Sequence, residues 1–236
     1  PSLTLFRSDI SFYFKYIKQT KADLTKNGFI SEKEYNSFRF MDHSIGHFMN
    51  LAKKEKYIDS TIFVFFGDHG ISGYGGQNTP QFESDFDLTG LHVPFVIYSP
   101  KLIKKNVINK VASQVDMLPT VAALASKSYT NTTMGRDLLN PELDADRHAF
   151  IITHNNYHSL TLVSKDYTFK VLADRANPNL FATDQTQFTH SNNKSTKKYI
   201  DVSQQHPKLT DKYKRLTLGI YETSKYMLYH NKSLDN

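Results

Sequence analysis

The sequence predicts an α/β fold in which a covered sheet is followed by a smaller antiparallel part. Residues 61–66 form an unbroken β-prone run, which is typical of a strand covered on both faces in the middle of a parallel sheet. A helical apolar pattern over residues 31–56 directly precedes that run. Short alternating runs after residue 149 indicate an antiparallel meander.

The composition narrows the class of protein. The chain has 236 residues, 39% of them apolar, which supports a real core, and a formal charge of +6. Lysine on solvated faces is the simplest cause of that charge, and attraction to anionic substrates or lipid headgroups is the functional alternative. No basic patch interleaved with aromatic residues is present, so we expect no nucleic-acid partner. The absence of cysteine excludes disulfides and thiolate metal sites.

The helix over residues 31–56 has a clear start signal. Ser31 and Glu34 have the spacing of a capping box. Apolar residues then recur every three or four positions and predict one buried face that packs on the sheet: Tyr35, Phe38, Met41, Ile45, Phe48 and Ala52.

Two histidines on this helix have the spacing of metal ligands. His43 and His47 lie one helical turn apart, but they fall opposite the apolar face. We therefore expect a solvated pair. Asp42 lies next to the apolar face, and we expect it to be structural.

Asp68 and His69 follow the strand at residues 61–66 immediately after Gly67. In open α/β sheets, ligands bind just beyond the carboxyl ends of strands. A carboxylate and an imidazole placed side by side there are two ready metal ligands. The alternative is an ordinary turn in which Asp68 caps a backbone amide and His69 is solvated.

A long polar loop and a second strand follow. Residues 71–91 are rich in glycine and predict a lid or rim near the site; Asp85 and Asp87 in it are expected to be solvated. His92 precedes a second apolar strand over residues 93–98. It is the candidate substrate-binding residue, and it can reach Asp68 only if the loop folds back or this strand runs antiparallel to the first.

The remaining elements complete the prediction. Asp116 has the position of an N-cap for a buried helix over residues 117–126. Three short strands are expected from residues 149–154, 160–165 and 167–172, then a loop. A final amphipathic helix is expected over residues 209–229.

Several stretches resemble the sulfatase-type branch of the alkaline phosphatase superfamily. They are FRFMDHSIGHFM from Phe38, TIFVFFGDHG from Thr61, LHVPFVIYSP from Leu91, SQVDMLPTVAALA from Ser113, and MGRDLL from Met134. Within that branch the chain is most similar to the membrane-anchored, lipoteichoic acid synthase-like phosphoglycerol transferases, and SKYMLYHNK from Ser224 resembles their ending. The match runs in order over residues 31–140.

The resemblance implies a three-layer α/β/α sheet followed by a small antiparallel meander and a terminal helix. Residues 1–145 would be the C-terminal half of the catalytic core, and residues 146–236 its antiparallel subdomain. Asp68 and His69 match the family's metal ligands. The family's Thr or Ser nucleophile, a further acidic ligand and a substrate-binding histidine would lie upstream of Pro1, so we expect no catalytic nucleophile within the chain.

The resemblance also implies cofactors, partners and a location. We expect one or two divalent ions, Mn²⁺ or Zn²⁺, with Mg²⁺ and Ca²⁺ as alternatives. The expected substrate is a phosphate or sulfate ester such as a glycerophospholipid, and the expected partner is the N-terminal half of the same protein. Members of the family are anchored at the periplasmic or extracellular face of the membrane. The alternative is a non-catalytic domain that recognises an anionic cell-envelope polymer or lipid headgroup.

Overall fold

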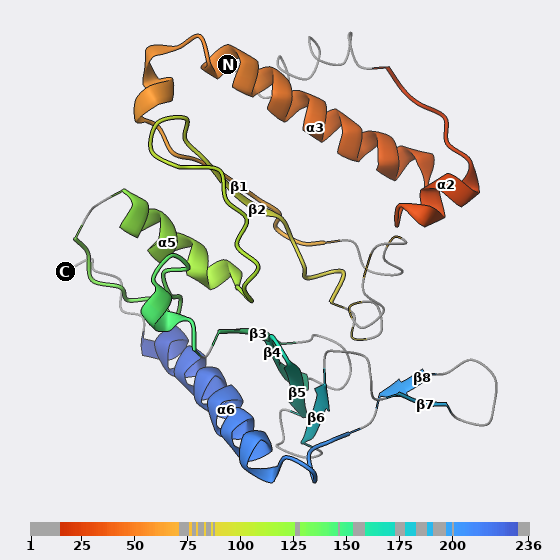
Figure 1. Cartoon of the computed structure of the whole chain (residues 1–236), viewed down its shortest axis with the longest axis vertical. Coiled ribbons are helices and arrows are strands. Elements are labelled where there is room, and N and C mark those ends of the chain that lie inside the picture. Colours follow the sequence, from red (N-terminus) through yellow and green to blue (C-terminus); the bar gives the residue numbers. More distant parts are fainter. Residues whose placement is uncertain are drawn as a thin grey trace. The chain divides into compact units, whose positions relative to one another are not determined.

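The computed structural model describes residues 15–70, 76, 79, 83, 86, 88–125, 128–145, 147–152, 159–172, 178–182, 188–190, 197–199 and 201–230. It divides into two compact units, residues 1–106 and 107–236 (Figure 1). The functional division at residues 145/146 stays a prediction. No described helix is both long enough and apolar enough to cross a membrane.

The helices of the first unit begin at side-chain caps. In α2, Lys21–Lys26, Thr20 accepts a hydrogen bond from the amide of Asp23. In α3, Glu32–Ala52, the hydroxyl of Ser31 accepts from the amide of Glu34 at 3.1 Å. The Glu34 carboxylate in turn accepts from the amide of Ile30 at 2.7 Å. The predicted cap is therefore confirmed, except that Glu34 bonds the amide before Ser31 and not that of Ser31 itself.

Two strands form an antiparallel ribbon in this unit. Strand β1, Phe63–Phe66, follows the 3₁₀ helix η1, Lys56–Ser60, and pairs with β2, Phe95–Tyr98. The prediction of a covered strand in a parallel sheet is therefore wrong for the described chain. Here β1 has only the antiparallel β2 as a partner, and none of its four residues is buried.

The apolar stripe on α3 is also more exposed than its periodicity predicted. Ala52 is buried, and the Phe48 ring packs edge-on against Phe63 at 6.0 Å between centroids. Between 40% and 51% of Phe38, Met41, Phe48 and Leu51 is nevertheless exposed. Periodicity shows which face of a helix is apolar. Whether that face is buried depends on which other elements pack against it.

The second unit begins with the 3₁₀ helix η2, Gln114–Asp116, and α5, Met117–Leu124. The buried Asp116 carboxylate does not cap α5. Instead it accepts from the amide of Ser113 at 2.9 Å and from that of Arg136 at 2.8 Å. The prediction of a largely buried α5 is only partly right, because Leu118 is exposed.

The core of the second unit lies between a meander and the last helix. Strands β3, His148–Ile152; β4, Ser159–Ser164; β5, Tyr167–Leu172; and β6, Asn179–Ala182 pair in chain order, all antiparallel. Helix α6, Pro207–His230, contacts β4 and β5. The side chains at the centre of this core are at most 1% exposed: Leu160, Leu162, Phe169, Val171, Leu180 and Val202. The meander and terminal helix are confirmed, whereas β6 and the hairpin of β7, Phe188–His190, and β8, Lys197–Tyr199, lie in a stretch predicted as loop.

Two carboxylates, those of Asp144 and Asp201, form hydrogen bonds that join segments of this unit. Burial opposes ionisation of Asp201, but hydrogen bonds from Asn179, Leu180 and Ser203 outweigh it, so the pKa of Asp201 is lowered. Hydrogen bonds from Lys110 and from Arg147 lower the pKa of Asp144. Both carboxyl groups are thereby held in the ionised form.

Candidate functional site

The candidate site lies at the end of the ribbon where β1 ends and β2 begins. Phe66 is opposite Phe95, the amide of Gly67 donates to the Pro94 carbonyl at 3.3 Å, and that of Gly70 donates to the Gly90 carbonyl at 2.8 Å. The segments 67–70 and 90–94 therefore lie side by side. Because β2 runs antiparallel to β1, His92 lies at the same end of the ribbon as Asp68 and His69.

Gly70 allows this close approach of the two segments. A Cβ atom built on Gly70 would lie 2.1 Å from the carbonyl oxygen of Thr89 and 3.1 Å from that of His92. Real Cβ atoms do not come this close to backbone, so any larger residue must push the segments apart. The glycine after the Asp-His pair therefore has a steric role at the site.

The His69 ring is fixed by the backbone of the next residue. Its Nδ1 lies 2.8 Å from the Gly70 carbonyl oxygen, which can only accept a hydrogen bond. Nδ1 therefore carries the proton in this contact, and in the neutral ring Nε2 has the lone pair. Metal-binding histidines are commonly oriented in this way, with the non-ligating nitrogen donating to a carbonyl or carboxylate.

Asp68 contributes the second donor group. One of its oxygens accepts from the amide of His69 at 2.9 Å, and both residues are exposed. The turn geometry of the alternative interpretation is thus present, but it does not prevent ligation, because a carboxylate has lone pairs for several partners. One carboxylate and one oriented imidazole are chemically suited to a divalent transition metal.

His92 is oriented by a residue that the sequence reasoning missed. Its Nδ1 lies 3.0 Å from a carboxylate oxygen of Glu83. Backbone hydrogen bonds fix both ends, since the Leu88 amide donates to the Glu83 carbonyl at 2.7 Å and the His92 amide donates to the Leu88 carbonyl at 2.8 Å. No local pattern marks Glu83 in the sequence, because the two residues in contact are nine positions apart.

The described residues do not form a complete metal site. They contain no group of three or more His, Asp or Glu side chains that could hold an ion together. A metal ion held by Asp68 and His69 would therefore need donors from elsewhere to reach the usual four. Asp85 and Asp87, which the sequence reasoning expected to be solvated, lie outside the described residues.

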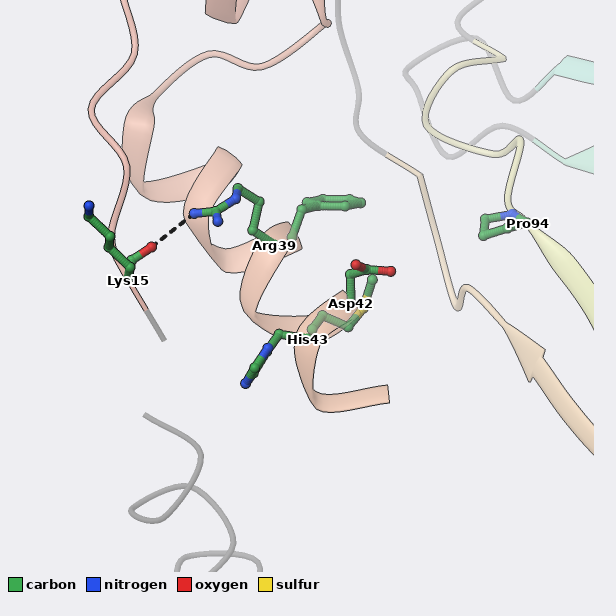
Figure 2. Close-up of a pocket in the computed structure, with 7 residues that line it drawn as sticks. Lys15, Arg39, Asp42, His43 and Pro94 are labelled. Atoms are coloured by element: carbon green, nitrogen blue, oxygen red, sulfur yellow. Dashed lines mark hydrogen bonds between the residues drawn. The ribbon is translucent and has the colours of Figure 1, made fainter. Parts of the chain in front are cut away.

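The side chains on α3 do not form a second site. His43 and His47 are exposed, as expected of a solvated pair. An open hollow is lined by Lys15, Arg39, Asp42, His43, Phe38, Met41 and Pro94. Figure 2 shows that the ends of the Lys15 and His43 side chains point away from Asp42, so these groups do not converge on one ligand. Arg39 instead donates to the Lys15 carbonyl at 3.0 Å.

Comparison with known proteins gives the site a context. Residues 14–128 match the family model described as Sulfatase. Lipoteichoic acid synthases from Staphylococcus aureus strains USA300 and NCTC 8325 are 27% identical over 202 residues, an alignment that covers 79% of this chain and 28% of theirs. The chain thus spans little more than a quarter of the length of these relatives.

Solved structures share the fold at low sequence identity. The lipoteichoic acid synthase LtaP from Listeria monocytogenes superposes with a TM-score of 0.62 and 16% identity, covering 92% of this chain and 50% of that one. A 2-O GAG sulfatase superposes with a TM-score of 0.52 and 15% identity, covering 91% and 48%. The α/β fold is therefore of the alkaline-phosphatase-like kind. The resemblance to its sulfatase-type branch, close to the lipoteichoic acid synthases, is confirmed.

Proposed function

We propose that this sulfatase-like chain is the metal-binding part of an enzyme that hydrolyses or transfers phosphate or sulfate esters. The observation that supports the proposal is the antiparallel pairing of β1 with β2. That pairing puts Asp68, His69 and His92 in neighbouring segments at one end of the ribbon. Such esters carry negative charge on their oxygens, and fixed cationic or hydrogen-bonding groups stabilise that charge.

Asp68 and His69 would hold the metal ion in this proposal. The mixed oxygen and nitrogen donor set suits Mn²⁺ or Zn²⁺ better than Ca²⁺. When bound, such an ion supplies Lewis-acid stabilisation of charge on the ester oxygens. The Gly70 carbonyl holds the His69 ring so that Nε2 is the ligating atom. Remaining donors and a Thr or Ser nucleophile are expected upstream of Pro1, and the anchoring at the outer membrane face is expected from the family.

The calorimetric titration of this chain with Mn²⁺ and with Zn²⁺ tests the metal assignment. The chain should bind Zn²⁺ weakly, and the double substitution Asp68→Ala/His69→Ala should remove that binding. Asp166→Ala, which removes an exposed carboxylate in the β4–β5 turn, serves as the control for charge and should leave binding unchanged. Equal binding by the native chain and the double variant, repeated in a polypeptide extended upstream of Pro1, would contradict the assignment.

His92 is proposed to bind the substrate, with Glu83 as its positioning residue. Because a carboxylate only accepts, the Glu83 contact keeps the proton on Nδ1 of the neutral His92 ring. Nε2 of the neutral ring then has the lone pair, so it can take up a proton but cannot donate to an ester oxygen. In the protonated ring, Nε2 becomes a charged donor to that oxygen.

The Glu83 contact predicts the tautomer of His92. At about pH 9, where an ordinary imidazole is neutral, ¹⁵N NMR should find the proton on Nδ1. Glu83→Ala should move it largely to Nε2, the form that solvated histidine favours, whereas Glu83→Gln should preserve Nδ1–H because the amide oxygen still accepts. Glu142→Ala, on an exposed residue of the other unit, is the control. An unchanged tautomer in Glu83→Ala would remove Glu83 from the site.

A further inference from the structure

The last turn of α6 is apolar on every side. Four consecutive side chains there are between 36% and 77% exposed: Tyr226, Met227, Leu228 and Tyr229. Because successive helical residues are about 100° apart, these four side chains surround the helix axis. Earlier in the helix, by contrast, Thr217 is buried, and Leu216 and Ile220 pack against the core of the second unit. Residues 226–229 thus form an exposed apolar collar at the end of α6.

The shape of this collar limits what can cover it. A protein surface that packs beside a helix buries a stripe roughly 100° wide, and would leave the rest of the collar in water. A medium that surrounds the end of the helix can cover all four side chains together. The interfacial layer of a lipid bilayer is such a medium. Unlike the hydrocarbon interior, it also contains water for the last carbonyl groups of the helix, which have no partner within it.

The side chains of the collar suit that layer. Tyrosine combines an apolar ring with a polar hydroxyl group and is enriched where membrane meets water. Tyr226 and Tyr229 supply two such rings, on either side of the apolar Leu228 in the sequence. The Tyr226 ring stacks on the His230 ring with 4.0 Å between centroids, and His230 Nδ1 donates to the Tyr226 carbonyl at 2.8 Å. These two contacts hold the Tyr226 ring against the end of the helix.

The charges near the collar favour a negatively charged bilayer. Residues 223–230 include Lys225 and His230 and no acidic residue. Lys225 pairs with Glu222 at 3.2 Å, and nearly half of each side chain is exposed. Because exposed ion pairs of this kind are weak, a lipid phosphate can replace Glu222 as the partner of Lys225. The formal charge of the whole chain, +6, has the same sign.

We infer that the collar is a membrane contact. In this contact residues 226–229 enter the interfacial layer of a bilayer that contains anionic phospholipid, and Lys225 lies at the level of the phosphates. A contact at one end of α6 orients the second unit on the bilayer. The inference does not rest on the proposed function, since it uses neither the Asp-His pair nor an ester substrate. It holds equally for an enzyme and for a binding domain.

A single introduced tryptophan tests the contact, because the chain has no tryptophan of its own. Leu228→Trp places it in the collar. Leu118→Trp is the matched control, because Leu118 lies on α5 of the same unit and is also exposed, at 64%. Vesicles of equimolar phosphatidylglycerol and phosphatidylcholine should shift the emission of Leu228→Trp to shorter wavelength and leave that of Leu118→Trp unchanged. An unshifted Leu228→Trp emission, in the chain and in the polypeptide extended upstream of Pro1, would overturn the inference.

Emission without vesicles distinguishes the bilayer from other occupants. In the chain and in the extended polypeptide, the tryptophan of Leu228→Trp should emit as an indole in water at every protein concentration. Emission at short wavelength in the extended polypeptide would mean that protein covers the collar. A shift that appears only as protein concentration rises would mean that a second copy of the chain covers it. Either result would overturn the inference.

Matched double substitutions measure how much the collar contributes to vesicle binding. In co-sedimentation, Leu228→Ser/Tyr229→Ser should lower the partition coefficient roughly tenfold or more, because two apolar side chains no longer leave water. Leu118→Ser/Tyr129→Ser removes the same types of exposed side chain elsewhere in the unit and should leave partitioning nearly unchanged. Binding to phosphatidylcholine alone should be roughly fivefold weaker. Equal losses in the two double variants, or equal binding to the two kinds of vesicle, would contradict the inferred contact.

Discussion

Asp68→Ala is expected to lower kcat/KM for ester cleavage at least about a thousandfold in the polypeptide extended upstream of Pro1. That loss is roughly 4 kcal/mol of transition-state stabilisation. The carboxylate lies just beyond Gly67 at the end of β1 and is proposed to supply one of the donors that hold the divalent ion. The removal of such a donor weakens the metal site and the charge stabilisation together. His69→Ala should act similarly, because it removes the adjacent imidazole.

The assay should compare a phosphate with a sulfate ester. A fluorescently labelled phosphatidylglycerol represents the glycerophospholipid class, and p-nitrophenyl sulfate represents the sulfate class. Asp166→Ala removes an equal charge from the β4–β5 turn and should retain native turnover. Undiminished turnover in Asp68→Ala would contradict the metal assignment. If the native polypeptide bound anionic lipid but cleaved neither ester, the non-catalytic binding domain would be the better account.

Gly135→Ala is expected to lower the free energy of unfolding of the second unit by about 4 kcal/mol, or to prevent its folding. A Cβ atom on Gly135 would lie 1.7 Å from the carbonyl oxygen of Val115 and 2.4 Å from its carbonyl carbon. These are backbone atoms, so no rotamer change relieves the clash. The segments cannot easily separate, because the Asp116 carboxylate accepts from the next amide, that of Arg136.

Gly219→Ala provides the matched control. Gly219 lies inside α6 of the same unit, and a Cβ there would have no neighbour within 4 Å. The substitution should therefore raise stability by about 0.5–1 kcal/mol, because glycine is a poor helix former. Urea unfolding followed by circular dichroism measures both variants. Equal stability of Gly135→Ala and the native chain would show that the two segments are not packed as described.

The sequence was sufficient to predict the structure where a residue interacts with others close to it in the chain. The cap at Ser31 involves residues within one turn, and α3 begins where that pattern predicts. The meander was predictable because β3, β4 and β5 follow one another with short connections. Strand β6 was missed because its four residues lie within a polar stretch that hides so short a run.

The sequence was insufficient where a distant segment decides the outcome. An apolar run predicts a strand but not the direction of the neighbouring strand. The sequence therefore left open whether β2 runs antiparallel to β1, which is the arrangement that brings His92 to the end of β1. The stripe on α3 predicted an apolar face correctly and its burial wrongly, since burial depends on what covers it. At the site, Asp68 and His69 were evident as an adjacent pair. Glu83 was not evident, because it lies nine positions from His92 and no sequence pattern joins the two residues.

The order of strands in the meander has a consequence for how the molecule is made. Strands β3, β4 and β5 each pair with the strand that follows them in the sequence, so only short connections must close. Folds dominated by such local pairings have low contact order and form quickly. In contrast, β1 and β2 pair across the much longer part of the chain between residues 66 and 95. The meander is therefore suited to form before the β1–β2 ribbon and the segment with Asp68 and His69 that follows β1.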